Sequence, residues 1–224
     1  MPKLTPALAA DRPALERVGA SVRARLAADP SVYTVPVDRA EIFAVTDFLS
    51  ADECAHLIAM IDRVARPSDL FEENYIDAYR TSYSGDVDST DSFVRMIDRR
   101  LSDLLGIDPS WGERFQGQRY HPGQEFKQHC DWFDTNAQYW SSETRRGGQR
   151  SWTAMAYLND VEEGGVTEFT RIGATVTPER GLLLVWNNAT PDGLPNHDTM
   201  HAACPVVKGV KYVVTKWFRT RRWS

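Results

Sequence analysis

The sequence predicts an α+β fold in which helices come first and a β-rich half, folded as a sandwich or jelly roll, follows. Two observations carry this prediction. Amphipathic helical periodicity appears before residue 106, and short apolar or alternating runs, separated by Gly, Pro, Asn and Asp, follow Trp111. A length of 224 residues suits one domain with an extension. We expect a helical extension over residues 1–36 and a single domain over residues 37–224.

Composition and charge argue against several protein classes. With 26 basic and 31 acidic residues the net charge is −5, a poor match for the phosphate backbone of nucleic acids. No apolar run is long enough to cross a bilayer, and no secretory signal is apparent. The three cysteines, Cys54, Cys130 and Cys204, form neither a CxxC pair nor a disulfide framework. We expect a soluble, cytoplasmic protein that binds neither nucleic acid nor membrane.

Residues 11–28 have the periodicity of an amphipathic helix. Apolar side chains recur at three- and four-residue intervals, Asp11 is placed to cap the helix, and Pro13 falls in its first turn. A mitochondrial presequence is an alternative, but Asp11, Glu16 and Asp29 do not fit an acid-poor transit peptide. We expect a helix that docks on the domain.

Further helices and strands are expected before residue 107. Residues 41–48 are strand-like, and Ser50 with Glu53 forms a capping box that opens a helix. A strand is expected around residues 75–83, and the helix after it stops at Gly106. These helices would brace one face of the β-rich half.

Six runs after Trp111 have the pattern of strands, with turn residues between them. They are residues 115–120, 125–133, 152–159, 166–170, 182–187 and 210–218. Their number and spacing favour a sandwich or jelly roll.

His129 and Asp131 are the most informative polar residues. Strand alternation places them on one face and Cys130 on the other, so an imidazole and a carboxylate can bind one ion from a single strand end. A lone HxD motif is a weak signal, because a strand-end histidine beside a solvated aspartate has the same pattern.

A third ligand must come from elsewhere in the chain. Of the five histidines, only His197 and His201 lie in a second ordered, β-rich segment. His201 opens a run in which Lys208-Gly209 marks a turn, and we expect the strand after that turn to pair back beside it. His197 lies in a loop rich in Pro, Gly and Asn, which favours His201 as the ligand.

Two histidines and a carboxylate are the ligand set of non-haem Fe(II) oxygenases, which keep coordination positions open. Those positions suit a bidentate acid and dioxygen. Zinc is the rival ion, but a zinc hydrolase also needs a general base, and the sequence contains no HExxH motif. Iron chemistry therefore fits better.

Lys211 is the candidate partner for a carboxylate at the far end of such an acid. It lies ten residues after His201, and alternation places it on one strand face with Val213, Thr215 and Trp217. A lysine among inward apolar neighbours needs an anion. The alternative is a reversed parity, in which Lys211 lies on a solvated edge.

Five motifs, in this order, resemble those of the prolyl 4-hydroxylase branch of the Fe(II)/2-oxoglutarate dioxygenases. They are YHPGQEFKQHCD (Tyr120–Asp131), YLN (Tyr157–Asn159), GGVTEF (Gly164–Phe169), HAACPVVKGVK (His201–Lys211) and Lys216-Trp217. The resemblance spans roughly residues 41–219. It implies a double-stranded β-helix, which is a jelly roll with its site between two sheets and is braced here by the N-terminal helices.

The resemblance also implies roles for individual residues. His129, Asp131 and His201 would hold Fe(II), and Lys211 would bind the distal carboxylate of 2-oxoglutarate. Tyr120, Thr167 and Tyr157 match positions that hydrogen-bond this co-substrate, and Trp217 would line the substrate pocket. Lysine in place of arginine points to the collagen-type and microbial branch.

The implied reaction couples oxidation of 2-oxoglutarate by O2, which releases succinate and CO2, to hydroxylation of an unactivated C–H bond, with ascorbate as a candidate reductant. The expected substrate is a prolyl residue in a peptide or protein. A free amino acid or other small molecule is the alternative substrate, and a non-catalytic jelly-roll binding module is the alternative function.

Residues 132–151 align with the family only as the variable loop between two core strands. Tyr139 and Trp140 could contact a proline ring, and Gly147 and Gly148 could let the loop move, so a substrate lid is one interpretation. A long hairpin loop is the other.

Overall fold

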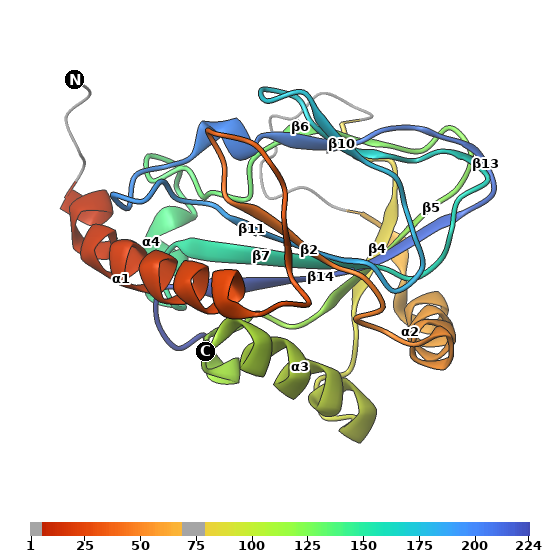
Figure 1. Cartoon of the computed structure of the whole chain (residues 1–224), viewed down its shortest axis with the longest axis horizontal. Coiled ribbons are helices and arrows are strands. Elements are labelled where there is room, and N and C mark those ends of the chain that lie inside the picture. Colours follow the sequence, from red (N-terminus) through yellow and green to blue (C-terminus); the bar gives the residue numbers. More distant parts are fainter. Residues whose placement is uncertain (1–5, 69–78) are drawn as a thin grey trace.

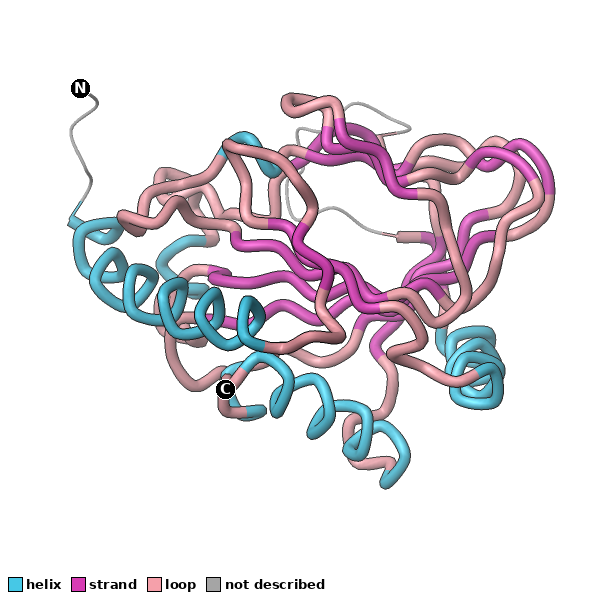
Figure 2. Tube along the Cα trace, in the orientation of Figure 1, coloured by secondary structure: helices cyan, strands magenta, loops and turns pink. Residues whose placement is uncertain are grey.

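A computed structural model describes residues 6–68 and 79–224. An eight-stranded sheet and a four-stranded sheet form two layers, and helices cover the outer face of the larger sheet (Figures 1 and 2). This is the predicted jelly-roll core braced by helices.

The larger sheet has the order β1 (Tyr33–Thr34), β2 (Ile42–Val45), β11 (Leu183–Asn187), β7 (Arg150–Tyr157), β14 (Lys211–Arg219), β5 (Gln116–Tyr120), β4 (Tyr83–Asp86) and β3 (Arg66–Pro67).

The smaller sheet has the order β10 (Ala174–Val176), β9 (Thr167–Phe169), β12 (His201–Ala203) and β6 (Phe126–His129). A further pair joins β13 (Val206–Lys208) to β8 (Glu163–Gly164). The strand predicted around residues 75–83 lies mostly outside the described residues, and β4 begins at Tyr83.

Two of the helices begin and end as their sequences predict. In α2 (Ala51–Val64), both bonds of the capping box between Ser50 and Glu53 are present. The α3 helix (Ser92–Leu105) ends at Gly106, whose φ of 67° is the left-handed conformation that glycine adopts without strain. Cap chemistry within a few residues was sufficient to locate these ends.

The first helix differs from its prediction. The α1 helix (Pro6–Ala28) begins before Asp11, so Asp11 does not cap it. The Asp11 side chain is buried and is bound from outside the helix: it accepts a hydrogen bond from the Gln149 backbone N–H (2.9 Å) and pairs with Arg221. Asp11 therefore ties the helix to distant parts of the chain, where a helix cap was expected.

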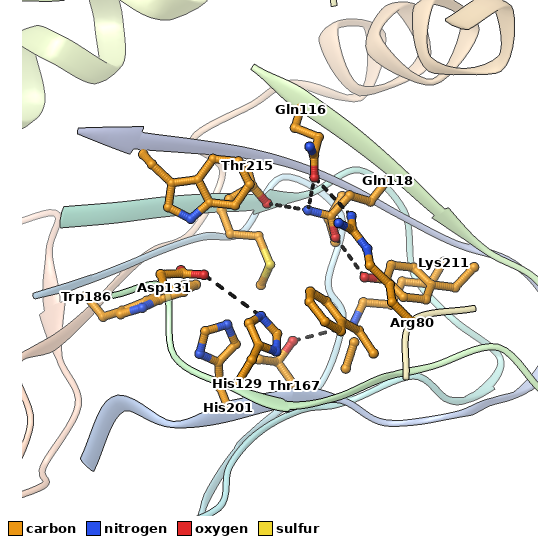
Figure 3. Close-up of a pocket in the computed structure, with 16 residues that line it drawn as sticks. Arg80, Gln116, Gln118, His129, Asp131, Thr167, Trp186, His201, Lys211 and Thr215 are labelled. Atoms are coloured by element: carbon orange, nitrogen blue, oxygen red, sulfur yellow. Dashed lines mark hydrogen bonds and ion pairs between the residues drawn. The ribbon is translucent and has the colours of Figure 1, made fainter. Parts of the chain in front are cut away.

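The hairpin predicted around Lys208-Gly209 is wrong. β12 pairs with β6 and β9 in the smaller sheet, whereas β14 pairs with β5 and β7 in the larger one. The chain crosses between the sheets after β13, and Ala203 of β12 and Val213 of β14 pack into the same apolar core from opposite sheets. His201 and Lys211 therefore approach the space between the sheets from opposite sides (Figure 3).

The two faces of the larger sheet contribute to two apolar cores. Along β7, Trp152, Ala154 and Ala156 pack with the helices, whereas Met155 and Tyr157 pack toward the smaller sheet. The second core leaves room for a pocket between the layers.

In the part of the chain that the structure describes, no helix has the length and apolar character of a membrane span. The α1 helix contacts α3 and β7 (Figure 1). The domain boundary at residues 36 and 37 stays a prediction.

Candidate active site

The three candidate ligands come together at one end of the pocket between the sheets. His129 ends β6, His201 begins β12, and the two residues are direct partners in the ladder. Asp131 lies two residues beyond β6. One donor atom from each residue lies within 4.8 Å of the other two, and His129 Nε2 is 3.8 Å from Asp131 Oδ1 (Figure 3). Among the described residues this is the one cluster of its kind.

Backbone carbonyls orient both imidazoles. His129 Nδ1 is 2.8 Å from the carbonyl oxygen of Lys127, and His201 Nδ1 is 2.9 Å from that of Thr199. Because a carbonyl only accepts, each Nδ1 is the protonated nitrogen and each Nε2 keeps a lone pair. Metal-binding histidines are commonly held in this way.

Aromatic neighbours restrict the rotation of the rings. Phe126 stacks on His129 with a centroid separation of 3.7 Å, and Trp186 lies edge-on to His201 at 4.9 Å. The side chains are therefore positioned before any ion binds.

The protonation states of His129 and Asp131 also suit metal binding. Burial, together with the neighbouring His201, lowers the pKa of His129, so its imidazole is neutral at physiological pH. Burial opposes ionisation of Asp131, but the nearby histidines and Arg150 outweigh burial and lower the pKa of its carboxyl. A neutral imidazole, as in His129, and an ionised carboxylate, as in Asp131, are the forms that bind a divalent cation.

Lys211 lies at the opposite end of the pocket with its ammonium inside the protein (Figure 3). Only 1% of the residue is exposed, and burial lowers its pKa to about 7. The ammonium is 3.4 Å from Thr167 Oγ1 and 5.5 Å from the centroids of Tyr120 and Tyr157. Because the residue is buried, the solvated-edge alternative is wrong. No described carboxylate pairs with the ammonium, so the site is suited to an anion from solution.

The three residues predicted to hydrogen-bond the co-substrate, Tyr120, Thr167 and Tyr157, lie beside Lys211. Tyr157 donates to Thr167 Oγ1 at 2.7 Å, so Thr167 accepts from both Tyr157 and Lys211 and keeps its own hydroxyl proton to donate. Tyr120 faces Lys211 across the β5–β14 ladder and donates to Gln118 at 2.7 Å. Burial raises the pKa of both tyrosines, which keeps them protonated.

Four polar residues line the pocket that the sequence analysis did not name as site residues: Arg80, Gln116, Gln118 and Thr215. Arg80 donates to Gln116 at 2.9 Å, and Gln118 lies 3.3 Å from Thr215 (Figure 3). Strand parity could have found three of them. Gln116 and Gln118 precede Tyr120 at two-residue intervals and so share its face of the strand, and Thr215 shares the face of Lys211. Arg80 precedes β4 and has no sequence signal.

Trp217 lines the pocket, but the other two predicted substrate residues do not. Trp140 begins the short helix α4 (Trp140–Glu143) and is only 5% exposed. Tyr139 packs on Phe133, and its hydroxyl accepts from the Asp134 backbone N–H at 3.0 Å. Both residues stabilise the loop itself, so the structure does not bring them to the predicted position.

Buried charges hold the loop over residues 132–151 to the sheet. Glu143 is 2.5 Å from Arg219 on β14, and both side chains are nearly inaccessible. Gln149 bonds the backbone of Phe133 through both its side-chain oxygen and its amide nitrogen. These contacts do not favour a hinged lid.

We expect Trp140→Ala to lower the free energy of unfolding by about 3–5 kcal/mol, because it removes a buried indole and leaves a cavity. Urea titration would measure the loss, and Ser141→Ala, an exposed site on the same helix, is the control. Unchanged stability with selectively slower turnover of a peptide would instead support the lid.

The sequence is similar to that of known oxygenases. Residues 115–219 match the family described as the 2OG-Fe(II) oxygenase superfamily. A probable prolyl 4-hydroxylase 8 from Arabidopsis thaliana is 32% identical over 211 residues, which cover 81% of this chain and 69% of that protein. The prolyl 4-hydroxylase subunit alpha-1 of Gallus gallus is 36% identical over 144 residues, 64% of this chain but only 28% of the subunit.

Solved structures show the same fold. The viral collagen prolyl hydroxylase of Paramecium Bursaria Chlorella virus-1, in complex with 2OG, superposes with a TM-score of 0.63 and 25% identity, covering 80% of this chain and 95% of the viral protein. A Pseudomonas putida prolyl-4-hydroxylase superposes with a TM-score of 0.58 over 90% of this chain at 19% identity, which bears on the fold alone.

Proposed function

Because the chain belongs to the prolyl 4-hydroxylase-like branch of the 2OG-Fe(II) oxygenase superfamily and is a 2-oxoglutarate-dependent dioxygenase, we propose that it hydroxylates a prolyl residue in a peptide or protein. Fe(II) is its cofactor, and 2-oxoglutarate and O2 are its co-substrates. The observation that carries the proposal is the pocket itself, which has a ligand cluster at one end and, at the other, a buried lysine with no carboxylate partner among the described residues.

The residues at the cluster fit the metal. His129 and His201 each offer Nε2, and Asp131 offers a carboxylate oxygen, which is the two-histidine, one-carboxylate set of non-haem iron oxygenases. Bound there, Fe(II) supplies the redox chemistry that activates dioxygen. The chain's contribution is to hold the ligands in place and to keep water away with the surrounding apolar core.

Lys211, Thr167 and Tyr120 line the pocket and would bind 2-oxoglutarate, whereas Tyr157 does not line it and would act by holding Thr167 in place. The ammonium of Lys211 would pair with the distal carboxylate, and Thr167 has a hydroxyl proton to donate to the same group. Bound in this way, the acid would have its other end free to reach toward His129 and His201, which line the same pocket.

Two donors on the pocket wall are suited to the carbonyl groups of a peptide. The indole Nε1 of Trp217 is buried and donates to no described acceptor. The guanidinium of Arg80 lies 4.7 Å over the Phe126 ring and has no carboxylate partner among the described residues. The carbonyl groups of a peptide could accept from both donors along the wall.

The test is turnover with defined peptides. Purified enzyme with Fe(II), 2-oxoglutarate and ascorbate should release succinate in the presence of proline-containing peptides, and mass spectrometry should place one added oxygen on proline. Peptides with alanine in place of proline are the matched control. Oxidation of free proline without any peptide product would contradict the proposal and support the small-molecule alternative.

Binding of 2-oxoglutarate should depend on pH, because the pKa of Lys211 is about 7 in the free protein. The distal carboxylate binds the charged form, so binding above pH 7 requires uptake of a proton and the apparent Kd should rise by up to about tenfold per pH unit. Anaerobic calorimetry of the Mn(II)-loaded protein between pH 6.5 and 8.5, in buffers of different ionisation enthalpy, would measure both effects. A Kd that is constant with pH and involves no proton uptake would contradict this assignment.

The use of ascorbate and the cytoplasmic location stay predictions.

A further inference from the structure

A chain of two hydrogen bonds runs from Asn188 through Thr153 to the carboxylate of Asp131. Thr153 on β7 donates its hydroxyl proton to Asp131 Oδ2 at 2.7 Å. Asn188, the residue after β11, donates from its amide Nδ2 to Thr153 Oγ1 at 2.9 Å. All three residues are buried, with Thr153 at 0% and Asn188 at 1% exposure.

The direction of these bonds follows from the carboxylate. An ionised Asp131 can only accept, so the single hydroxyl proton of Thr153 must point to it. Thr153 must then accept from its other neighbour, which requires Asn188 to present its amide nitrogen rather than its oxygen. The opposite orientation of the amide would draw the Thr153 proton away from Asp131.

This orientation leaves the Asn188 Oδ1 atom without a partner among the described atoms, although it is buried. Leaving a buried acceptor unsatisfied is unfavourable. The amide nevertheless lies in this orientation because the bond to Thr153 serves a charged group, and hydrogen bonds to charged groups are the stronger ones.

The main chain of Asn188 is held at both ends. Its N–H donates to Ser151 at 2.8 Å, and its carbonyl accepts from the Asn196 N–H at 3.0 Å. The Asn196 carbonyl accepts from the Thr199 hydroxyl, and Thr199 in turn orients His201. One loop, residues 188–199, therefore supports both Asp131 and His201.

We propose that Thr153 and Asn188 are positioning residues that keep Oδ2 of Asp131 engaged, so that Oδ1 is the one carboxylate oxygen offered to the metal. Oδ1 is the oxygen that lies 3.8 Å from His129 Nε2. A carboxylate that bound through both oxygens would occupy one of the positions that 2-oxoglutarate and O2 need. The inference rests on the metal site of the proposed function and adds residues that act through Asp131.

The direct test compares Thr153→Val with Thr153→Ser. Valine keeps the branched shape and loses the hydroxyl, whereas serine keeps the hydroxyl. Titration of metal-free protein with Mn(II), followed by the EPR signal of the free ion, should show an affinity about 10- to 100-fold lower for Thr153→Val. Thr153→Ser should stay within about threefold of the wild type, by the same argument.

A spectroscopic measurement separates positioning from general support of the fold. The infrared difference spectrum on adding Mn(II) reports whether a carboxylate binds through one oxygen or two. We expect the one-oxygen signature in the wild type and in Thr153→Ser, and a shift toward the two-oxygen signature in Thr153→Val. Wild-type affinity and an unchanged spectrum in Thr153→Val would overturn the proposal.

Asn188→Ala is the second variant, for the case in which Thr153→Val does not fold. Its Mn(II) affinity should fall by about tenfold, the low end of the range for outer partners, because Thr153 keeps its bond to Asp131 and loses only the partner that directs it. His197→Ala, on the same loop but outside the ligand cluster, is the control and should bind as the wild type does.

Wild-type affinity in Asn188→Ala would overturn the role of the amide. A wild-type protein that binds no Mn(II) would overturn the metal site itself. Metal binding that depends on Thr153, together with failure to oxidise any proline peptide, would leave this inference standing and contradict the proposed substrate alone.

Discussion

Substitution of His129, Asp131 or His201 by alanine is expected to abolish turnover. Each variant leaves two of the three clustered ligands. Loss of a residue that hydrogen-bonds a ligand lowers metal affinity by about 10- to 100-fold, and loss of the ligand itself should lower Mn(II) affinity further. Mn(II) titration and succinate release would check the two effects separately.

His197→Ala is the matched control, because His197 lies four residues before His201, on the short 3-10 helix His197–Thr199. It should retain both metal binding and turnover. Loss of metal binding in His197→Ala, with His201→Ala unaffected, would mean that the third ligand has been assigned to the wrong histidine.

Lys211→Met should raise the KM for 2-oxoglutarate by at least about tenfold, because a hydrogen bond to a charged group contributes about 1.5–3 kcal/mol. Mn(II) affinity should not change, since Lys211 lies at the end of the pocket away from the ligands. Initial rates at varied 2-oxoglutarate, with saturating peptide and iron, would measure the KM.

Lys216 provides a matched control on the same strand. It is also buried, but it lies on the opposite face of β14 and pairs with Asp98 of α3 at 2.9 Å. Lys216→Met should therefore lower the stability and leave the KM for 2-oxoglutarate unchanged. Equal KM values in Lys211→Met and in the wild type would remove Lys211 from the co-substrate site.

Local sequence determined the parts of the fold that depend on neighbours along the chain. The capping box at Ser50 and the glycine at residue 106 located helix ends, because their hydrogen bonds span only a few residues. The parity of β14 was predictable for the same reason: Lys211 and Trp217 share a face whatever the strand pairs with.

The candidate site was also largely predictable. The HxD spacing and the run from His201 to Lys211 resemble motifs of a known family, and the structure brings these residues to one pocket. The sequence could not show which strands β12 and β14 pair with. A hairpin between β12 and β14 satisfies every local rule, yet the two strands lie in different sheets, because apolar residues of both strands are buried in the core between those sheets.

Residues whose roles depend on distant partners were missed or misplaced. Trp140 looked like a lid residue but is buried, and Asp11 looked like a cap but holds the Gln149 backbone and Arg221. The contact from Asn188 through Thr153 to Asp131 joins three segments far apart in the chain. The sequence by itself therefore determined the family, the ligand spacing and the strand parity, whereas tertiary packing alone decided which side chains meet, because burial brings together residues that no local pattern relates.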